Sequence, residues 1–288
     1  MKVRKAVILA AGLGTRMLPV TKVVPKELLP VVDTPAIQLV AEEAARSGIE
    51  EIIFVISPGK TSLIEHFAPA PELERALEER EKLELLDLVQ SVGKLARITA
   101  VEQHQPLGLG HAVLQAKSAV GGEPFAVMLP DDIFDCQPPL LRQLLDVAEG
   151  QTAPAVALLE VPRSEVSKYG IVEGSKTGEH IYRISGMVEK PSPERAPSQL
   201  AIMGRYVLPP EIFGLLEHAE PGVGGEIQLT DALLALAEHR ALYGYQFTGA
   251  RYDLGDRVGF VLAQVAYALK RPDLAASLRP RLRELLLS

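Results

Sequence analysis

Cysteine is nearly absent from this sequence of 288 residues, which contains a single one, Cys136. A lone cysteine excludes an internal disulfide and fits a reducing compartment. Because no reactive-site signature surrounds Cys136, we interpret it as a small structural side chain. Histidine is also scarce. The six histidines, His111 among them, form no His-x-His or His-Glu-x-x-His spacing, so nothing indicates a zinc site or a catalytic histidine.

Long apolar runs are missing as well. No stretch of the chain reaches the roughly 18 apolar residues that a membrane-spanning helix needs. Near the start, Lys2, Arg4 and Lys5 precede the apolar run Ala6–Ala11, but this run is shorter than the roughly 7–15 residues of a signal-peptide core. We therefore interpret it as a strand, expect no membrane partner, and expect a cytoplasmic protein.

An excess of positive charge is lacking too. The chain carries 30 Lys and Arg residues against 37 Asp and Glu, for a formal net charge of −7. This balance argues against a general nucleic-acid-binding surface, so no nucleic-acid partner is expected. It also gives an anionic substrate no overall attraction. Binding of a phosphate would therefore need local cations or a metal ion.

What the chain does contain begins with apolar runs of strand length. Val3–Ala10 and Ile52–Ile56, with a helix at Ala36–Ser47 between them, predict a βαβ unit. From 168 to 208 short strands follow too closely for helical crossovers, which predicts a mixed sheet. The predicted class is α/β, with a mixed, mostly parallel central sheet flanked by helices. Further strands are expected at Ile98–Val101, Phe125–Leu129, Ala155–Val161 and 240–247, and helices within 110–119, 209–219, 228–239 and 256–270.

Residues 71–92 differ from their surroundings in being strongly charged. Leucines recur among the charges with a spacing that suits an amphipathic helix or a helix pair projecting from the sheet. Two interpretations remain open, a solvated surface helix or a contact with a partner or another subunit.

The first predicted strand runs into LAAGLGTRM, residues 9–17. A P-loop would need Gly-x4-Gly-Lys-Ser/Thr, and the dinucleotide fingerprint a third glycine, and both are absent. Glycines such as Gly12 and Gly14 let backbone N–H groups approach a phosphate or base closely. Arg16 and Lys26 can bind phosphate oxygens, one as a fork and the other as a point charge. The segment therefore predicts a phosphate site of neither common nucleotide type.

Three other polar features are ambiguous by themselves. Asp131 and Asp132 end a predicted strand, where ligands of open α/β sheets bind, but such a pair is more often a turn or a helix cap. Glu189 and Lys190, before a proline, would by themselves be a surface ion pair and a turn. Gln103 alone would be a solvated loop side chain. None of the three identifies a site without further information.

Seven segments follow one another in an order and spacing that chance does not explain. They are AAGLGTRMLPVTKVVPKELLPVVDTPAIQ (10–38), GLGHAV (108–113), LPDD (129–132), YGIVE (169–173), VEKP (188–191), APSQLAIMGRYVL (196–208) and GEIQLTDAL (225–233). Together they resemble the sugar-1-phosphate nucleotidylyltransferases, and more narrowly the bacterial uridylyl branch of that family, which also carries a helical insertion like 71–92. The resemblance covers nearly the whole chain and implies the family's Rossmann-like fold. It also implies a Mg²⁺-dependent reaction whose substrates and products are UTP, glucose 1-phosphate, UDP-glucose and pyrophosphate.

The resemblance implies a nucleotide site in the first part of the chain. In the family, a Gln five residues before the first Gly of Gly-Leu-Gly-His reads the base, and Gln103 and Gly108 have this spacing. A glutamine amide offers a donor and an acceptor together, which suits O4 and N3–H of uracil. Arg16 and Lys26 would hold the leaving pyrophosphate. The nucleotide-binding residues implied are Ala10, Ala11, Gly12, Gly14, Gln103 and Gly108.

The sugar and metal sites are implied in the same way. Lys190 would bind the sugar phosphate, and with Arg16 and Lys26 it completes the implied catalytic set. Asp131 would be the Mg²⁺ ligand, and Asp253 matches an aspartate that binds a metal in the related thymidylyl enzymes. For Glu226 two interpretations remain open, a sugar contact or a brace for the helix that follows it. The sugar-binding residues implied are Asp132, Gly170, Glu189 and Glu226.

The expected organisation is a single nucleotidylyltransferase domain over 1–288. Homodimers or homotetramers are implied, with the leucines of 71–92 and the tail 271–288 as candidate contacts. Within the domain we expect a nucleotide-binding part at about 1–135, the helical insertion at about 71–92, a sugar-binding part at about 136–255 and a C-terminal helical segment at about 256–288.

Two alternative functions remain. The first is the same reaction with dTTP or another hexose 1-phosphate, because Gln103 alone does not distinguish uracil from thymine. The second is a non-catalytic regulatory subunit that binds nucleotide sugars. One departure from the family pattern is Gln199, which stands where Asn is expected and weakens the transfer of any role to that position. The second alternative is disfavoured because four implied active-site residues are all retained, namely Arg16, Lys26, Asp131 and Lys190.

Overall fold

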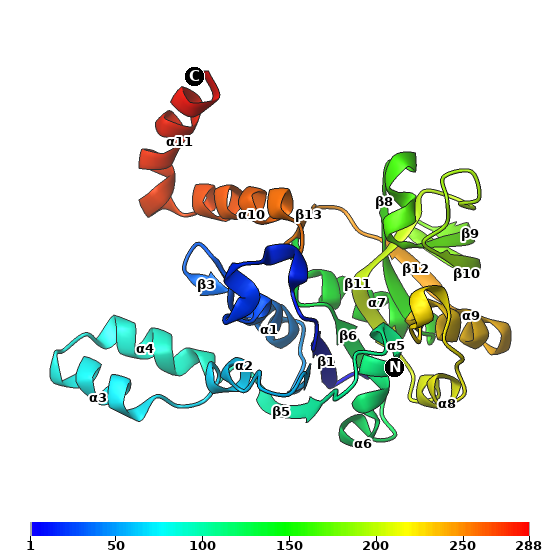
Figure 1. Ribbon diagram of the computed structural model, residues 1–288, viewed down its shortest axis with the longest axis horizontal. Coiled ribbons are helices and arrows are strands. Elements are labelled where there is room, and N and C mark those ends of the chain that lie inside the picture. The colour runs from blue at the N-terminus through cyan, green and yellow to red at the C-terminus, as the bar shows by residue number, and fades with distance from the viewer. Residues whose placement is uncertain (1, 288) are drawn as a thin grey trace.

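A computed structural model describes residues 2–287, which form a nine-stranded sheet with helices on both faces (Figure 1). The strand order is β5-β4-β1-β6-β11-β8-β12-β10-β9, and two further pairs, β2–β3 and β7–β13, lie outside this sheet. The strands are β1 Lys5–Ala10, β2 Pro30–Val31, β3 Thr34–Pro35, β4 Glu51–Ile56, β5 Arg97–Glu102, β6 Phe125–Met128, β7 Asp132–Asp135, β8 Ala155–Glu160, β9 Gly170–Gly178, β10 Ile181–Glu189, β11 Leu200–Leu208, β12 Tyr243–Gln246 and β13 Ala250–Asp253.

Half of the sheet is parallel. Strands β5, β4, β1 and β6 run in one direction, with Ala10 opposite Ile56 and Ile56 opposite Glu102. The carboxyl ends of these strands therefore meet at one edge, where open α/β sheets bind their ligands. The predicted βαβ unit is confirmed, because helix α1 (Ala36–Arg46) lies between β1 and β4 in the chain and these two strands pair in parallel.

The other half of the sheet is mixed. Strand β11 runs antiparallel to both β6 and β8, β12 is parallel to β8, and β9 and β10 form an antiparallel pair. The closely spaced strands after residue 168 account for this change of direction, since they leave no room for crossover helices. The predicted α/β class with a mixed central sheet is confirmed.

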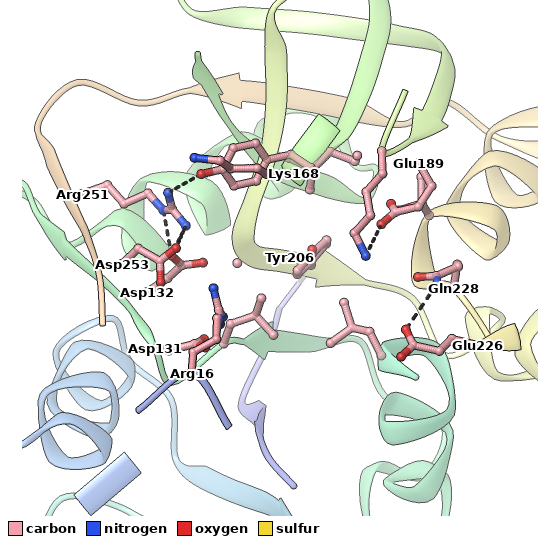
Figure 2. A pocket seen from close by; sticks show the side chains of 18 residues that line it. Arg16, Asp131, Asp132, Lys168, Glu189, Tyr206, Glu226, Gln228, Arg251 and Asp253 are labelled. Carbon is pink, nitrogen blue, oxygen red and sulfur yellow. Dashed lines mark hydrogen bonds and ion pairs between the residues drawn. The ribbon is translucent and has the colours of Figure 1, made fainter. Parts of the chain in front are cut away.

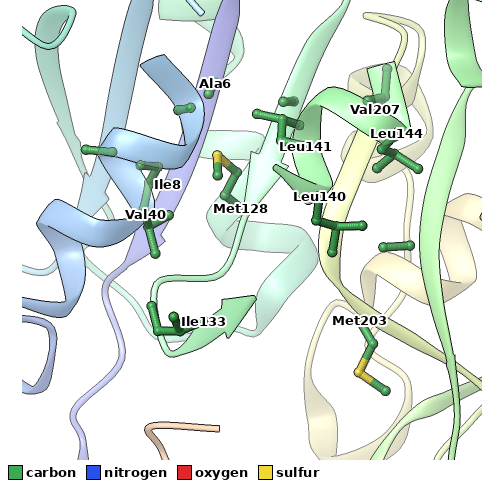
Figure 3. Close-up of a cluster of buried hydrophobic side chains, with 14 of the residues drawn as sticks. Ala6, Ile8, Val40, Met128, Ile133, Leu140, Leu141, Leu144, Met203 and Val207 are labelled. Carbon is green, nitrogen blue, oxygen red and sulfur yellow. The ribbon is translucent and has the colours of Figure 1, made fainter. Parts of the chain in front are cut away.

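Two hydrophobic cores cover the two faces of the sheet. Along β1, Ala6, Ile8 and Ala10 belong to one core, while Val7 and Leu9 belong to the other, as expected for a strand buried on both faces. Helices α1 and α7 (Leu140–Gln151) pack on the first face, part of which Figure 3 shows. On the second face pack α5 (Leu109–Gln115), α8 (Ile212–Glu217) and α9 (Leu229–His239). This packing fixes the strands whose ends form the site.

Helix α7 was not anticipated from the sequence, although its buried leucines at 140, 141, 144 and 145 repeat at helical spacing. The segment 71–92 is a pair of helices, α3 and α4, which extends away from the body, and α11 extends outward beyond α10 (Figure 1). The helices are α1 Ala36–Arg46, α2 Ser62–Glu65, α3 Pro71–Glu79, α4 Leu83–Val92, α5 Leu109–Gln115, α6 Lys117–Val120, α7 Leu140–Gln151, α8 Ile212–Glu217, α9 Leu229–His239, α10 Arg257–Lys270 and α11 Pro272–Leu287.

Within residues 2–287, none of these helices combines the length and the apolar character needed to cross a bilayer.

Candidate active site

A cleft of about 330 Å³ opens between the two halves of the sheet. In Figure 2, Arg16, Asp131 and Asp253 lie on one side of it, and Glu189 and Glu226 on the other. These side chains come from segments far apart in the sequence. The cleft brings together eight of the residues implied by the family resemblance: Arg16, Asp131, Asp132, Gly170, Glu189, Lys190, Glu226 and Asp253.

The remaining residues implied by the resemblance lie beside the cleft rather than in its lining. Lys26 borders a smaller hollow that also contains Gly14 and Arg16, and its ammonium reaches Asp131. Ala10 ends β1, and Gln103 follows β5, so both lie at the same edge of the parallel half. The lining of the cleft includes none of the six implied nucleotide-binding residues, namely Ala10, Ala11, Gly12, Gly14, Gln103 and Gly108.

The glycines after β1 make room for Lys26. Gly14 has a positive φ of 68°, and a Cβ atom there would lie 3.1 Å from the Cβ of Lys26. At Gly12 a Cβ atom would lie 3.7 Å from the Lys26 side chain, which is an ordinary contact. Arg16 lies over Gly255, is exposed, and has no hydrogen-bond or ion-pair partner within residues 2–287. Its guanidinium is thus available to an incoming anion.

A buried ion pair between Lys60 and Glu27 supports the backbone of this glycine loop. Lys60 donates hydrogen bonds to the carbonyl oxygens of Ala10 (2.8 Å) and Gly12 (2.6 Å), and it also contacts the buried carboxylate of Glu27. Burial raises the pKa of Glu27, partly offset by Lys60, and burial lowers the pKa of Lys60. The pair therefore anchors the loop backbone. Sequence reasoning missed both residues: Lys60 belongs to none of the seven segments, and Glu27, although it lies within 10–38, was assigned no role.

Lys26 and Asp131 form a close ion pair. The Lys26 ammonium donates to Asp131 Oδ2 over 2.6 Å, and both side chains are largely buried. Burial by itself would lower the pKa of Lys26, but the charge and hydrogen bond of Asp131 outweigh it and the pKa is raised. Burial opposes ionisation of Asp131 too, but Lys26 outweighs it and the pKa is lowered. Both groups are therefore charged at neutral pH.

Arg251 organises the carboxylates on the other side of Asp131. Its guanidinium binds Asp132 Oδ1 (Nε at 2.7 Å), approaches Asp253 Oδ2 at 3.6 Å, and donates to the Tyr169 hydroxyl at 3.1 Å. Burial raises the pKa of Asp132 to about 6, opposed by Arg251 and reinforced by Asp131 and Asp253. Asp132 and Asp253 face each other in the β7–β13 pair, which the sequence did not predict.

A second buried pair fixes the backbone of the same turn. Arg205, which is fully buried, binds Glu43 of α1 and donates hydrogen bonds to the carbonyl oxygens of Leu129 and Asp132. Its guanidinium also lies over the ring of Phe134. The motif GRYVL contains Arg205, but no sequence signal showed that it supports the aspartates. Its role is to hold the Asp131–Asp132 turn in place.

The far side of the cleft carries the sugar-site candidates. Glu189, at the end of β10, accepts a hydrogen bond from Thr230 (2.6 Å), and its carboxylate is 3.5 Å from the Lys190 ammonium. Lys190 has a left-handed φ of 47°, and 44% of its side chain is exposed. At Gly170 a Cβ atom would lie 3.1 Å from both Glu189 and Thr230, so a side chain there would crowd this corner.

Gly108 has a packing reason as well as an implied nucleotide role. Its φ is 106°, and a Cβ atom there would lie 2.7 Å from the Cβ of Glu226. Glu226 thus braces the loop at Gly108 while lining the cleft. The structure also fits the alternative that Glu226 braces the following helix, because its carboxylate accepts a hydrogen bond at 3.4 Å from Gln228, the N-cap residue of α9. Gln199 lies apart and donates to Val161, and half-buried Cys136 is outside the cleft.

The carboxylates suit a Mg²⁺ ion. Asp131 and Asp253 line one cleft, and the backbone N–H of Leu254 donates to the Asp131 carbonyl (2.8 Å), so the two strand ends are adjacent. Across residues 2–287, no group of three or more His, Cys, Asp or Glu side chains is arranged to hold a metal by itself. Two carboxylates with phosphate oxygens and waters is the usual protein environment of Mg²⁺. The donor set therefore fits a metal that arrives with a phosphate ligand.

This combination of fold and site defines a nucleotide-transferring enzyme class, and comparison with known proteins agrees. The nucleotidyl transferase family model matches residues 5–269, and the chain belongs to this family. Among curated relatives, the UTP–glucose-1-phosphate uridylyltransferase of Bacillus subtilis is 47% identical over 285 residues, covering 99% of this chain and 98% of its own. That of Streptococcus pneumoniae is 49% identical, covering 96% of this chain and 94% of its own.

Solved structures place the similarity within the same branch. A UTP-bound UDP-glucose pyrophosphorylase from Acinetobacter baumannii matches with a TM-score of 0.91 and 39% identity, over 99% of this chain and 100% of the other. A UDP-glucose pyrophosphorylase complexed with UDP-glucose matches with a TM-score of 0.85 and 41% identity, over 94% and 100%. The resemblance to the bacterial uridylyltransferases is thereby confirmed.

Proposed function

We propose that this protein transfers UMP from UTP to glucose 1-phosphate, giving UDP-glucose and pyrophosphate. The observation that carries the proposal is the single cleft that gathers Arg16, Asp131, Glu189 and Lys190 from separate segments. Relatives bearing this activity in their names cover nearly the whole chain, and similar structures hold UTP or UDP-glucose. No feature of the described residues favours a second function.

The reaction is an in-line displacement at phosphorus. An oxygen of the glucose 1-phosphate attacks the α-phosphorus of UTP, the bond to the β-phosphate oxygen breaks, and pyrophosphate leaves. No base is required, because a sugar phosphate is already ionised at neutral pH. What the protein supplies is alignment of two anions that repel each other and neutralisation of their charge.

The residues divide this work between the two sides of the cleft. Lys190 binds the sugar phosphate while Glu189 accepts hydrogen bonds from sugar hydroxyls. Arg16 and Lys26 bind the departing pyrophosphate. A Mg²⁺ ion held by Asp131 and Asp253 would stabilise the charge that develops on the phosphates. Gln103 reads the base, and Asp132, Gly170 and Glu226 form the remainder of the sugar pocket.

A pyrophosphate-release assay tests the proposal. Each of the nucleoside triphosphates is offered with a panel of hexose 1-phosphates, and UTP with glucose 1-phosphate should give the highest kcat/KM. A preference for dTTP or for another hexose would replace the substrate assignment. A complete absence of pyrophosphate release would instead favour the non-catalytic alternative. We also propose a cytoplasmic location and a homodimeric or homotetrameric assembly, neither of which the pyrophosphate-release assay tests.

A further inference from the structure

The residue proposed to read the base is itself held by a histidine. The amide nitrogen of Gln103, Nε2, lies 2.9 Å from His111 Nδ1 and 3.4 Å from the carbonyl oxygen of Gly108. Gln103 is buried, with 6% of its surface exposed. The sequence indicated no zinc-binding or catalytic role for His111. In the structure it contacts a candidate binding residue directly.

These contacts determine which way the Gln103 amide points. The Gly108 carbonyl oxygen can only accept a hydrogen bond, so the amide group facing it must be the nitrogen. Both hydrogens of that nitrogen are then used, one toward Gly108 and one toward His111. It follows that His111 Nδ1 accepts, and that the neutral ring carries its proton on Nε2.

The other ring nitrogen completes the network. His111 Nε2 lies 3.1 Å from the side-chain amide of Gln115. For Nε2–H to donate, this amide must turn its oxygen toward the ring, which a rotation of the amide group provides. His111 is then a neutral relay between two glutamines, and its tautomer is set by the Gly108 carbonyl.

The remaining polar side-chain atom of Gln103 is its amide oxygen, Oε1. Within residues 2–287, the amide oxygen of Gln103, Oε1, has no hydrogen-bond partner. Oε1 is not fully buried either, because Thr99 Oγ1 is the only fully buried side-chain N or O atom in these residues that lacks a partner. Oε1 is therefore open to a ligand. With both hydrogens of Nε2 engaged, Gln103 would offer a ligand an acceptor alone, whereas the sequence led us to expect a donor and an acceptor together.

We propose that His111 is a positioning residue for base selection, which orients Gln103 so that only Oε1 faces the nucleotide. The proposal rests on the proposed function and deepens it. Uracil and thymine carry a hydrogen at N3 and can donate to Oε1. Cytosine has a lone pair at N3, so two acceptors would face each other and one would remain unpaired. The site should therefore favour UTP over CTP through His111, without a direct contact between His111 and the base.

Two variants of the same shape separate positioning from packing. Leucine and asparagine have similar size and branching, but only asparagine has an oxygen near the position of Nδ1 to accept from Gln103. The ratio of kcat/KM for UTP to that for CTP is measured with saturating glucose 1-phosphate. His111→Leu should lower this ratio by about tenfold, the worth of one hydrogen bond, and His111→Asn should keep it within about threefold of the native value.

A purely structural role gives a different result. It would reduce turnover with both nucleotides alike, and leave the UTP-to-CTP ratio of His111→Leu within about twofold of native, which overturns the proposal. A native protein that uses CTP as well as UTP also overturns it. If the native protein turns over no UTP, the proposed function fails instead.

A measurement on the native protein removes any dependence on the folding of a variant. Nitrogen-15 NMR distinguishes a protonated from an unprotonated imidazole nitrogen. We expect an unprotonated Nδ1 and a protonated Nε2 for His111 near neutral pH. The opposite tautomer would place the Gln103 nitrogen toward the base and contradict the proposal.

Discussion

The two sides of the cleft hold their lysines differently. On the side formed by the parallel strands, Lys26 is 16% exposed and lies 2.6 Å from its partner Asp131. On the side formed by the mixed strands, Lys190 is 44% exposed and lies 3.5 Å from Glu189. The first lysine is fixed before any ligand arrives, whereas the second is free to meet one.

This difference follows from what lies behind each lysine. Lys26 packs against the glycine loop, whose carbonyl oxygens at Ala10 and Gly12 are bound by Lys60, and lies beside a turn fixed by Arg205. Lys190 follows the last residue of β10, and its backbone N–H donates to the carbonyl oxygen of Tyr169. A rigid nucleotide side and a more adaptable sugar side would suit an enzyme that has to bring two anions together. Four substitutions test this comparison.

The largest effect is expected at Asp131. Asp131→Asn removes the charge that pairs with Lys26 and the proposed Mg²⁺ ligand together, so kcat/KM should fall about a thousandfold. Pyrophosphate release titrated with Mg²⁺ measures it. Asp135→Asn is the matched control, because Asp135 ends β7, the strand that directly follows Asp131, but pairs with Lys270 outside the cleft. An unchanged Mg²⁺ titration in Asp131→Asn would contradict the assignment.

A smaller loss of activity is expected on substitution of Lys190, the more exposed of the two lysines. Lys190→Ala should lower kcat about a hundredfold while the KM for UTP stays within about threefold, since Lys190 is proposed to contact only the sugar phosphate. Lys26→Ala should raise the KM for UTP in addition to lowering kcat, because Lys26 is proposed to bind the triphosphate. Steady-state kinetics with both substrates varied measures the split, with exposed Lys176→Ala as control. Near-normal turnover of Lys190→Ala at saturating glucose 1-phosphate would remove Lys190 from the mechanism.

The smallest effect concerns stability at the junction of the two sides. The folded-state pKa of Asp132, about 6, lies above the value of about 3.9 for an unfolded aspartate. The folded protein therefore takes up this proton first as pH falls, and the ionised group costs stability at pH 7 and above. Asp132→Asn should raise Tm by about 2–4 °C at pH 7.5, and the gain should shrink toward pH 4.

Thermal unfolding across this pH range checks the prediction. Asp87→Asn, an exposed position on α4, should leave Tm unchanged at every pH. A lower Tm for Asp132→Asn at pH 7.5 would mean that the ion pair with Arg251 contributes more than burial costs.

Much of the fold was predictable because its signals are local. Strands β1 and β4 are continuous apolar runs, and the helix pair in 71–92 follows from its leucine spacing. Helix α7 was missed although its leucines carried the same signal. The β7–β13 pair had no usable signal, because two four-residue strands nearly 120 positions apart are brought together by the fold and by no local pattern.

The sequence by itself determined the family and the α/β class and predicted eight of the residues that line the cleft, since motifs and periodicities depend on near neighbours in the chain. Only the tertiary structure decided how those residues are held. Lys60 with Glu27, Arg205 with Glu43, and Arg251 with Asp132 are ion pairs whose members are 33, 162 and 119 positions apart. Such pairs form where packing removes water and brings opposite charges together from distant segments, and no local pattern records which charges will meet.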